Sequence, residues 1–201
     1  MKQSLNILNS EIGYKNKVVL SKLNLSFSPG QIHLIIGNNG EGKTTLLKTL
    51  AGAIAPIKGV VTPVIPGDVS FLSTEFSFND YNISGKEYID LISTLNDFDE
   101  SDFDESFQLI KETVSNSTLE LSSGMRQILR IKSLSLKSKS VFIWDEPLKS
   151  LAPEIKILVT KYLNEKAKTK LVIVTDHSDK NWIEYNPFVY KISAGAIVKD
   201  V

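Results

Sequence analysis

The residues best suited to chemistry in this sequence lie between Gly37 and Thr44, where the chain reads GNNGEGKT. They match the pattern G-x-x-x-x-G-K-[ST] at every fixed position. A short apolar run, Ile32–Ile36, precedes them, and a helix-like stretch, Thr44–Leu50, follows. Strand, glycine-rich loop and helix in this order are the context that supports the pattern. Glycines let backbone N–H groups surround an anion, and the helix N-terminus adds positive potential. The sequence therefore predicts a phosphate-binding loop for a nucleotide.

Two side chains complete this phosphate loop. Lys43 is expected to reach the β- and γ-phosphates, and the Thr44 hydroxyl to bind Mg²⁺. ATP and Mg²⁺ are therefore the predicted ligands. The residues expected to contact the nucleotide here are Gly37, Asn38, Asn39, Gly40, Glu41, Gly42, Lys43, Thr44 and Thr45.

An acidic pair and a histidine follow two later apolar runs. Asp145 and Glu146 come directly after SVFIW at 140–144, and His177 closes the stretch that begins with LVIV at 171–174. Open α/β sheets bind ligands at the carboxyl ends of their strands. We expect Asp145 to hold Mg²⁺, directly or through water, and Glu146 to orient or deprotonate the attacking water. His177 is placed to contact the γ-phosphate, but spacing alone leaves an ordinary surface or core histidine equally open.

The composition is that of an ordinary globular domain. The 201 residues are 42% hydrophobic, and Lys+Arg and Asp+Glu both number 23, so no basic excess indicates a nucleic-acid partner. No apolar run approaches the roughly 18 residues of a membrane span, and residues 1–14 are too polar for a secretory signal. Cysteine is absent, which excludes disulfides and thiolate metal sites. We expect a single cytosolic domain.

Two strand-like stretches come first, Leu5–Ile12 and Val18–Phe27, and a polar turn at 13–17 separates them. They predict an antiparallel pair ahead of the phosphate loop. Tyr14 falls in the predicted turn, where a plain turn aromatic is the simpler interpretation. Later apolar strands alternate with helical patterns, which predicts a mainly parallel sheet with helices on both faces.

The region 76–119 differs in character and predicts a small helical subdomain inserted into the sheet-containing core. Ser84 and Glu87 fit a capping box, and apolar residues at helical spacing follow them. The acidic stretch at 97–105 is either a solvated connection between helices or a partner surface. A further helix opens near residue 121, with Ser122 or Ser123 as its N-cap.

Taken together, these segments resemble the nucleotide-binding subunits of ATP-binding cassette (ABC) ATPases, over essentially the whole chain. GNNGEGKTT looks like the Walker A motif, and FIWDEP resembles Walker B followed by the catalytic glutamate. LSSGM at 121–125 is similar to the LSGGQ signature, with Ser123 and Met125 departing from it. TDH looks like the switch segment that ends in His177.

This resemblance implies an α/β fold of the P-loop NTPase class. Its mainly parallel sheet is flanked by helices, with an N-terminal antiparallel β subdomain and an inserted small helical subdomain. The implied division of the single domain 1–201 is a core at 1–75 and 125–201 and an insertion at 76–124 that ends in the signature. Glu146, His177 and Lys43 become the expected catalytic residues.

The resemblance also implies a composite site. Tyr14 matches the aromatic residue that stacks on adenine, which reverses the simpler interpretation above. Two cassettes should pair head to tail around two ATP molecules. Ser122, Ser123 and Gly124 of one would then contact the ATP held by the other, because a helix N-terminus attracts phosphate.

Two departures concern coupling more than binding. Thr74 stands where the family carries the Q-loop glutamine; its hydroxyl can still serve the metal, but the side chain has less reach. Ala152 replaces the usual D-loop aspartate and can make no side-chain hydrogen bond across a dimer.

The first functional hypothesis is the ATPase subunit of an ABC transporter. It would drive separate membrane-spanning permease subunits and lie on the cytoplasmic face of the inner or plasma membrane, without nucleic acid. Two alternatives remain: a soluble non-transport ABC ATPase of the assembly or translation-factor type, or a weakly hydrolytic nucleotide switch. A phosphate-loop kinase is disfavoured by LSSGM. The substrate, its direction of transport, and pairing with itself or another ATPase are left open.

Overall fold

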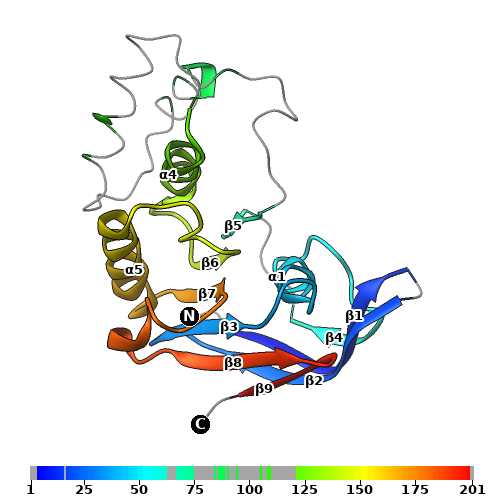
Figure 1. The fold of residues 1–201 in the computed structure, drawn as a ribbon. Coiled ribbons are helices and arrows are strands. Elements are labelled where there is room, and N and C mark those ends of the chain that lie inside the picture. The colour runs from blue at the N-terminus through cyan, green and yellow to red at the C-terminus, as the bar shows by residue number, and fades with distance from the viewer. Residues whose placement is uncertain are drawn as a thin grey trace.

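Figure 1 shows the computed structural model, which describes residues 4–15, 17–62, 67–74, 84, 86–88, 90, 94, 105, 108–109 and 121–199. Its described strands form two sheets. The larger sheet has the order β5-β6-β7-β3-β8-β9, and the smaller has the order β2-β1-β4. In the larger sheet all neighbours are parallel except β8 and β9.

The larger sheet consists of β3 (Ile32–Ile36), β5 (Val69–Leu72), β6 (Val141–Trp144), β7 (Leu171–Asp176), β8 (Phe188–Ser193) and β9 (Ala196–Lys199). The smaller sheet consists of β1 (Leu5–Tyr14), β2 (Lys17–Phe27) and β4 (Lys58–Val61). The helices whose bounds the structure describes are α1 (Lys43–Leu50), α4 (Ser123–Leu134), α5 (Pro153–Ala167) and the 3₁₀ turn η2 (Ile183–Tyr185).

The central strands are buried on both faces, which is why they read as continuous apolar runs. In β6, Phe142 and Trp144 pack toward α4 and α5, while Val141 and Ile143 pack toward α1 and the smaller sheet. Figure 1 shows α4 and α5 on one side of the larger sheet and α1 with the smaller sheet on the other. The same strands therefore contribute alternate side chains to two core layers, one on each face of the larger sheet.

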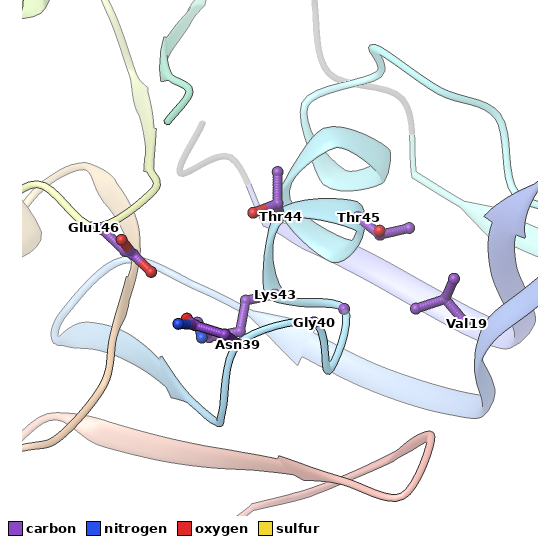
Figure 2. A pocket seen from close by; sticks show the side chains of 8 residues that line it. Val19, Asn39, Gly40, Lys43, Thr44, Thr45 and Glu146 are labelled. Atoms are coloured by element: carbon purple, nitrogen blue, oxygen red, sulfur yellow. The ribbon is translucent and has the colours of Figure 1, made fainter. Parts of the chain in front are cut away.

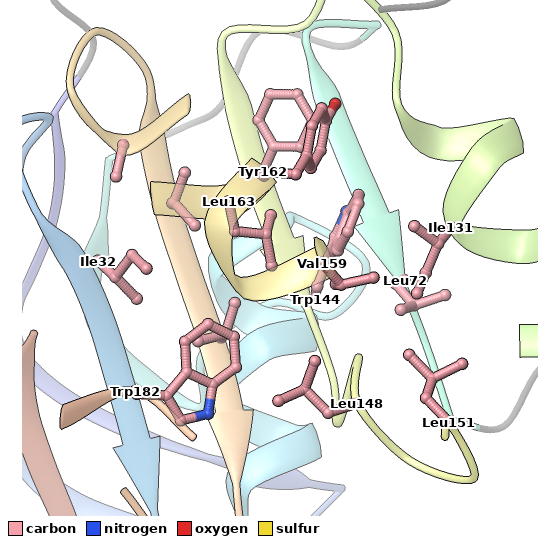
Figure 3. Packing of buried hydrophobic residues seen from close by; sticks show 14 of the residues in the cluster. Ile32, Leu72, Ile131, Trp144, Leu148, Leu151, Val159, Tyr162, Leu163 and Trp182 are labelled. Carbon is pink, nitrogen blue, oxygen red and sulfur yellow. The ribbon is translucent and has the colours of Figure 1, made fainter. Parts of the chain in front are cut away.

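The core on the α5 side contains two buried tryptophans (Figure 3). The ring of Trp144 stacks on Tyr162 of α5 with centroids 6.4 Å apart, and its indole N–H donates to Ser70 Oγ at 2.8 Å. Trp182 is fully buried beside β3 and β7. Burial of each large side chain contributes about 1.5–3 kcal/mol, so this layer fixes the strands that carry the site.

The sequence-based expectations about the elements are largely confirmed. The mainly parallel sheet, the antiparallel N-terminal pair, the helix expected at Thr44–Leu50 and the helix expected near residue 121 are all present. Ser122 is the N-cap of α4, with its Oγ accepting from the Met125 N–H at 3.2 Å. The predicted capping box is also present: Ser84 N donates to Glu87 Oε2 at 2.7 Å, and Glu87 N donates to Ser84 Oγ at 3.2 Å.

One expectation was wrong and others stay untested. Tyr14 does not lie in the turn: it is the last residue of β1 and pairs with Lys17, because the strands extend further than their apolar pattern. Most of the insertion expected at 76–124 lies outside the described residues. The boundaries of that insertion remain a prediction. Among the described residues, no helix combines the length and apolarity needed to cross a membrane.

His33 on β3 is a buried histidine with a structural role. Its side chain bonds to the Ser28 carbonyl through Nε2 at 2.8 Å and to Tyr190 Oη through Nδ1 at 3.1 Å. The ring also packs edge-on against Phe27, with centroids 5.2 Å apart. Burial lowers the pKa of His33 below its ordinary value of 6.5, with the nearby charge of Lys199 acting in the same direction. The neutral ring is therefore part of the fold.

We predict that this histidine makes folding stability depend on pH. In the unfolded chain His33 binds a proton near pH 6.5, whereas the folded chain binds it only at lower pH. The contribution of His33 to the unfolding free energy is complete above the pKa that His33 has in the unfolded chain. It is lost as the pH falls from that value through the lower pKa of His33 in the folded chain. Between these two pKa values the unfolding free energy should fall by at most about 1.4 kcal/mol for each pH unit, because the two states differ by one bound proton. Urea unfolding at about pH 8 and about pH 5.5 measures this loss.

His33→Phe keeps an aromatic ring in place and should flatten the dependence of the unfolding free energy between those pH values, even where it lowers overall stability. An unchanged slope in His33→Phe would contradict the assignment.

Candidate nucleotide-binding and hydrolysis site

The phosphate loop leaves β3 at the carboxyl edge of the sheet and enters α1 at Lys43. Its last glycine, Gly42, has φ 105° and is the N-cap of α1, so no side chain occupies the first N–H groups of the helix. A Cβ on Gly42 would lie 2.6 Å from Val19 Cγ1 of β2. Both the left-handed backbone and this close approach require glycine. The result is a helix N-terminus available to an anion.

The loop is held in shape by its own side chains. Lys43 is only 5% exposed, and its Nζ donates to the carbonyls of Gly37 at 2.7 Å and Asn38 at 3.1 Å. Glu41 accepts from the Asn38 backbone N–H through Oε2 at 2.5 Å. Its carboxylate is thus engaged inside the loop. The Lys43 ammonium and the Glu41 carboxylate thus connect parts of the loop to one another.

A cavity of about 190 Å³ lies over this loop (Figure 2). Figure 2 shows Glu146 reaching from the turn after β6 toward the loop that carries Asn39 and Lys43, with Val19 at the other end of the cavity. The lining residues are Val19, Asn39, Gly40, Gly42, Lys43, Thr44, Thr45 and Glu146. The structure therefore brings the predicted loop and the predicted catalytic glutamate together.

Asp145 lies at the centre of a cluster of threonine hydroxyls, and is only 1% exposed. Thr44 Oγ1 donates to Asp145 Oδ2 at 2.6 Å, and Thr74 Oγ1 donates to the same oxygen at 3.0 Å. Thr175 Oγ1 donates to Oδ1 at 2.5 Å. The three expected metal residues, Thr44, Thr74 and Asp145, thus meet at one point.

This donor set suits Mg²⁺. The hydrogen of the Thr44 hydroxyl is directed to Asp145, which leaves its lone pairs free for a cation. No cluster of three or more His, Cys, Asp or Glu side chains occurs among the described residues. Mg²⁺ is usually held by one or two protein groups together with water and substrate phosphates, so a dense carboxylate cluster is not required.

Glu146 begins the turn after β6 with φ 47°, a left-handed conformation that is uncommon outside glycine. Its carboxylate is mostly buried and lies between two basic side chains. His177 Nε2 is 3.2 Å from Glu146 Oε1, and Lys149 Nζ is 3.1 Å from Oε2. His177 is thereby linked to the acidic pair, which spacing alone had left open.

The switch segment around His177 is fixed by its neighbour Asp176. One carboxylate oxygen accepts from the His177 backbone N–H at 2.6 Å, and the other accepts from Trp182 Nε1 at 2.8 Å. Because Trp182 is fully buried in the core, the backbone of the switch is anchored to the core at its start. The imidazole itself is about half exposed.

The segment 121–125 does not line this cavity. Ser122 and Ser123 are exposed at the start of α4. Gly124 packs closely behind the turn after β6, since a Cβ there would lie 2.8 Å from the Ser150 carbonyl oxygen. Gln127, one turn on, donates to the Pro147 carbonyl at 2.9 Å. The start of α4 is thus packed against the turn after β6 of its own chain, while Ser122 and Ser123 are exposed.

The remaining residues that the sequence singled out, Tyr14 and Ala152, do not line the cavity. Tyr14 is 45% exposed at the end of β1 and does not line the cavity; Val19 of β2 does. Ala152 is the N-cap of α5 and makes no side-chain capping bond. Sequence reasoning missed Val19, Thr175, Gln127 and Lys149. Only Thr175 carried a signal, its place in the TDH segment.

Comparison with known proteins gives a consistent family. A family model described as ABC transporter matches residues 20–149, more than half of the chain. The chain is 32% identical to an uncharacterized ABC transporter ATP-binding protein of Methanocaldococcus jannaschii, over 84% of this chain and 66% of that protein. It therefore spans slightly less than two thirds of that relative.

Two further relatives are covered more fully. The chain is 30% identical to the cytochrome c biogenesis ATP-binding export protein CcmA of Reclinomonas americana, over 93% of this chain and 90% of that protein. It is 28% identical to the zinc import ATP-binding protein ZnuC of Wolbachia sp. subsp. Brugia malayi, over 94% of this chain and 79% of that protein.

Solved structures share the fold at lower identity. An ATP-binding subunit of an ABC transporter superposes with a TM-score of 0.73 at 19% identity, covering 99% of this chain and 90% of that one. A bacterial Atm1-family ABC exporter with ATP bound superposes with a TM-score of 0.77 at 15% identity, covering 98% of this chain and 38% of that one. Because the family model covers more than half of the chain and a relative 30% identical is matched over 93% of it, the chain belongs to the ABC transporter family and is one of its ATP-binding ATPase subunits.

Proposed function

We propose that this subunit binds MgATP on its phosphate loop, closes over it with a second cassette, and hydrolyses it to drive a separate membrane-spanning permease. One observation carries the proposal. Lys43, Thr44 and Glu146 line one cavity and Asp145 accepts from the Thr44 hydroxyl, while Ser122 and Ser123 are exposed outside that cavity. A complete site then needs two copies of such a chain.

Binding rests on the loop and the start of α1. The backbone N–H groups from Gly40 to Thr45 and the Lys43 ammonium supply donors and positive charge to the phosphates. Thr44 and Asp145, with Thr74 beside them, would hold Mg²⁺, which neutralises phosphate charge when bound. Tyr14 and Val19, from neighbouring strands of the smaller sheet, are the proposed contacts for the adenine side of the nucleotide.

Hydrolysis rests on Glu146 and His177. Water attacks the γ-phosphorus as the bond to the bridging β–γ oxygen breaks, and its proton passes to the Glu146 carboxylate. The products are ADP and inorganic phosphate. His177, 3.2 Å from Glu146, orients that carboxylate and offers a donor toward the γ-phosphate. Lys149 competes for the other carboxylate oxygen and must yield for Glu146 to accept the proton freely.

Pairing rests on the exposed N-terminus of α4. Ser122, Ser123 and the Gly124 backbone present N–H groups and a positive dipole end outward, which suits the γ-phosphate of a partner's ATP. Loss of that phosphate removes the bridge, so hydrolysis shifts the population toward the open pair. ATP binding and hydrolysis thereby close and open the pair of cassettes.

The permease would contact the hollow beside Thr74. A cavity of about 290 Å³ is lined there by Phe71, Leu72, Ser73, Tyr88, Arg130, Ser133 and Leu134. Ser73 leads directly into Thr74, whose hydroxyl bonds to Asp145. A partner segment in this hollow would contact Ser73, the residue next to the threonine that bonds to Asp145. Because named relatives include both an import and an export protein, direction and substrate are left to the permease.

We predict that Lys43→Ala weakens ATP binding by about 10- to 100-fold, since a hydrogen bond to a charged group is worth roughly 1.5–3 kcal/mol. Equilibrium titration with ATP measures the affinity. Lys48→Ala lies on the same helix but outside the cavity and should bind ATP as the unaltered chain does. Equal affinity of the Lys43 variant and the unaltered chain would remove the loop from the proposal.

We predict that Glu146→Gln binds ATP but loses about 10²- to 10⁴-fold in turnover, because an amide cannot accept the proton. ATP should then trap a dimer, visible by light scattering during size-exclusion chromatography. Glu154→Gln neutralises an exposed carboxylate in the first turn of α5 and should hydrolyse ATP normally. Turnover by the Glu146 variant at the unaltered rate would exclude Glu146 as the base.

We predict that the tagged chain, extracted in detergent from its native membranes, carries a multi-span protein with it. Ser133→Arg, which fills the hollow, should reduce that recovery and leave ATP binding unchanged. Ser138→Arg makes the same change on the exposed surface outside the hollow and should not. Recovery of only a water-soluble assembly would argue for the non-transport alternative.

A further inference from the structure

The hydroxyl of Thr175 joins the two acidic residues of the site. Thr175 is fully buried on β7, where it follows Val174, the partner of Trp144 in β6. This parallel register places it beside the turn that begins with Asp145. Its Oγ1 donates to Asp145 Oδ1 at 2.5 Å and accepts from the Glu146 backbone N–H at 2.9 Å. One hydroxyl thus touches both residues.

The chemistry of the partners fixes which way this hydroxyl points. An ionised carboxylate only accepts hydrogen bonds, and a backbone N–H only donates. The single hydrogen of Thr175 is therefore directed to Asp145, and a lone pair is directed to Glu146. Neither bond can reverse, so the arrangement has one orientation.

On the Asp145 side, this bond fixes the plane of the carboxylate. Oδ1 is held by Thr175, while Oδ2 accepts from Thr44 and Thr74. Without the bond to Oδ1, the carboxylate could rotate and Oδ2 would move from the Thr44 hydroxyl. Thr175 therefore acts on the metal-binding hydroxyl through Asp145.

On the Glu146 side, the bond supports an uncommon backbone. The φ of 47° at Glu146 is unfavourable for a residue with a Cβ. The N–H of that residue is satisfied by Thr175, and the conformation directs the Glu146 carboxylate to His177 at 3.2 Å. Removal of the acceptor would leave the N–H without its partner and free the turn to relax.

We propose that Thr175 is a positioning residue for ATP hydrolysis, which holds Asp145 and Glu146 in fixed relative orientation through its hydroxyl. This inference rests on the proposed function. It goes beyond that function because Thr175 does not line the cavity. It acts through the two acidic residues.

The test compares three variants of the full chain. Thr175→Val removes the hydroxyl and keeps the shape, and we expect kcat to fall about 10- to 100-fold with KM for ATP within about threefold. Thr175→Ser keeps the hydroxyl and should recover most of kcat. Thr160→Val is the matched control, since Thr160 is equally buried and its hydroxyl donates within α5 to the Ile157 carbonyl at 3.0 Å.

A second readout does not depend on turnover. Equilibrium ATP affinity is measured with and without Mg²⁺ for each variant. In Thr175→Val the affinity without Mg²⁺ should match the unaltered chain, because the phosphate loop is intact. The gain in affinity on adding Mg²⁺ should shrink, because Asp145 no longer holds Thr44 in place. Should Thr175→Val not fold, Thr175→Ala against Thr175→Ser gives the same contrast.

Several results would overturn the inference. An unchanged kcat in Thr175→Val would do so, as would an equal loss in Thr175→Ser, which would implicate the methyl group. A parallel loss of Mg²⁺-free ATP affinity would indicate general distortion. Failure of the unaltered chain to bind or hydrolyse ATP would instead refute the proposed function, so the two failures are distinguishable.

Discussion

The buried carboxylate of Asp145 is the interaction on which the site depends. Three hydroxyls reach it from segments far apart in the chain: Thr44 at the start of α1, Thr74 after β5 and Thr175 on β7. They can meet because parallel strands present their carboxyl ends at one edge of the sheet. The two core layers fix those strands, so hydrophobic packing determines the geometry of a polar centre.

The choice of hydroxyls over cations has a physical consequence. A carboxylate that is 1% exposed must be hydrogen-bonded, because burial of an unpaired charge is very costly. A buried Lys or Arg would satisfy Asp145 but also neutralise it. Three neutral donors satisfy it and leave its negative charge available to a cation. The arrangement therefore satisfies the hydrogen-bonding needs of the buried carboxylate and keeps a negative electrostatic potential suited to Mg²⁺.

Sequence reasoning predicted the parts that are local in the chain. The phosphate loop, its flanking strand and helix, and the acidic pair after β6 each follow from a contiguous pattern, and the structure brings the loop and Glu146 to one cavity. The roles of Thr175 and Gln127 could not be predicted in this way. Their contacts depend on strand register and on how α4 packs, which no periodicity records. Tyr14 was misplaced because β1 continues beyond its apolar residues.

The close contact between Gly42 and Val19 extends the influence of the β1–β2 hairpin into the site. The strands pair with several register shifts, including one between Ile12 and Gly13, opposite Val18 to Leu20. Slippage by one residue would exchange the faces of β2 and turn Val19 away from the phosphate loop. Hairpin turns ordinarily tolerate insertions, but an insertion after Tyr14 that shifted this register would move Val19 away from the phosphate loop. The length of an exposed turn is therefore under the same constraint as the loop that binds phosphate.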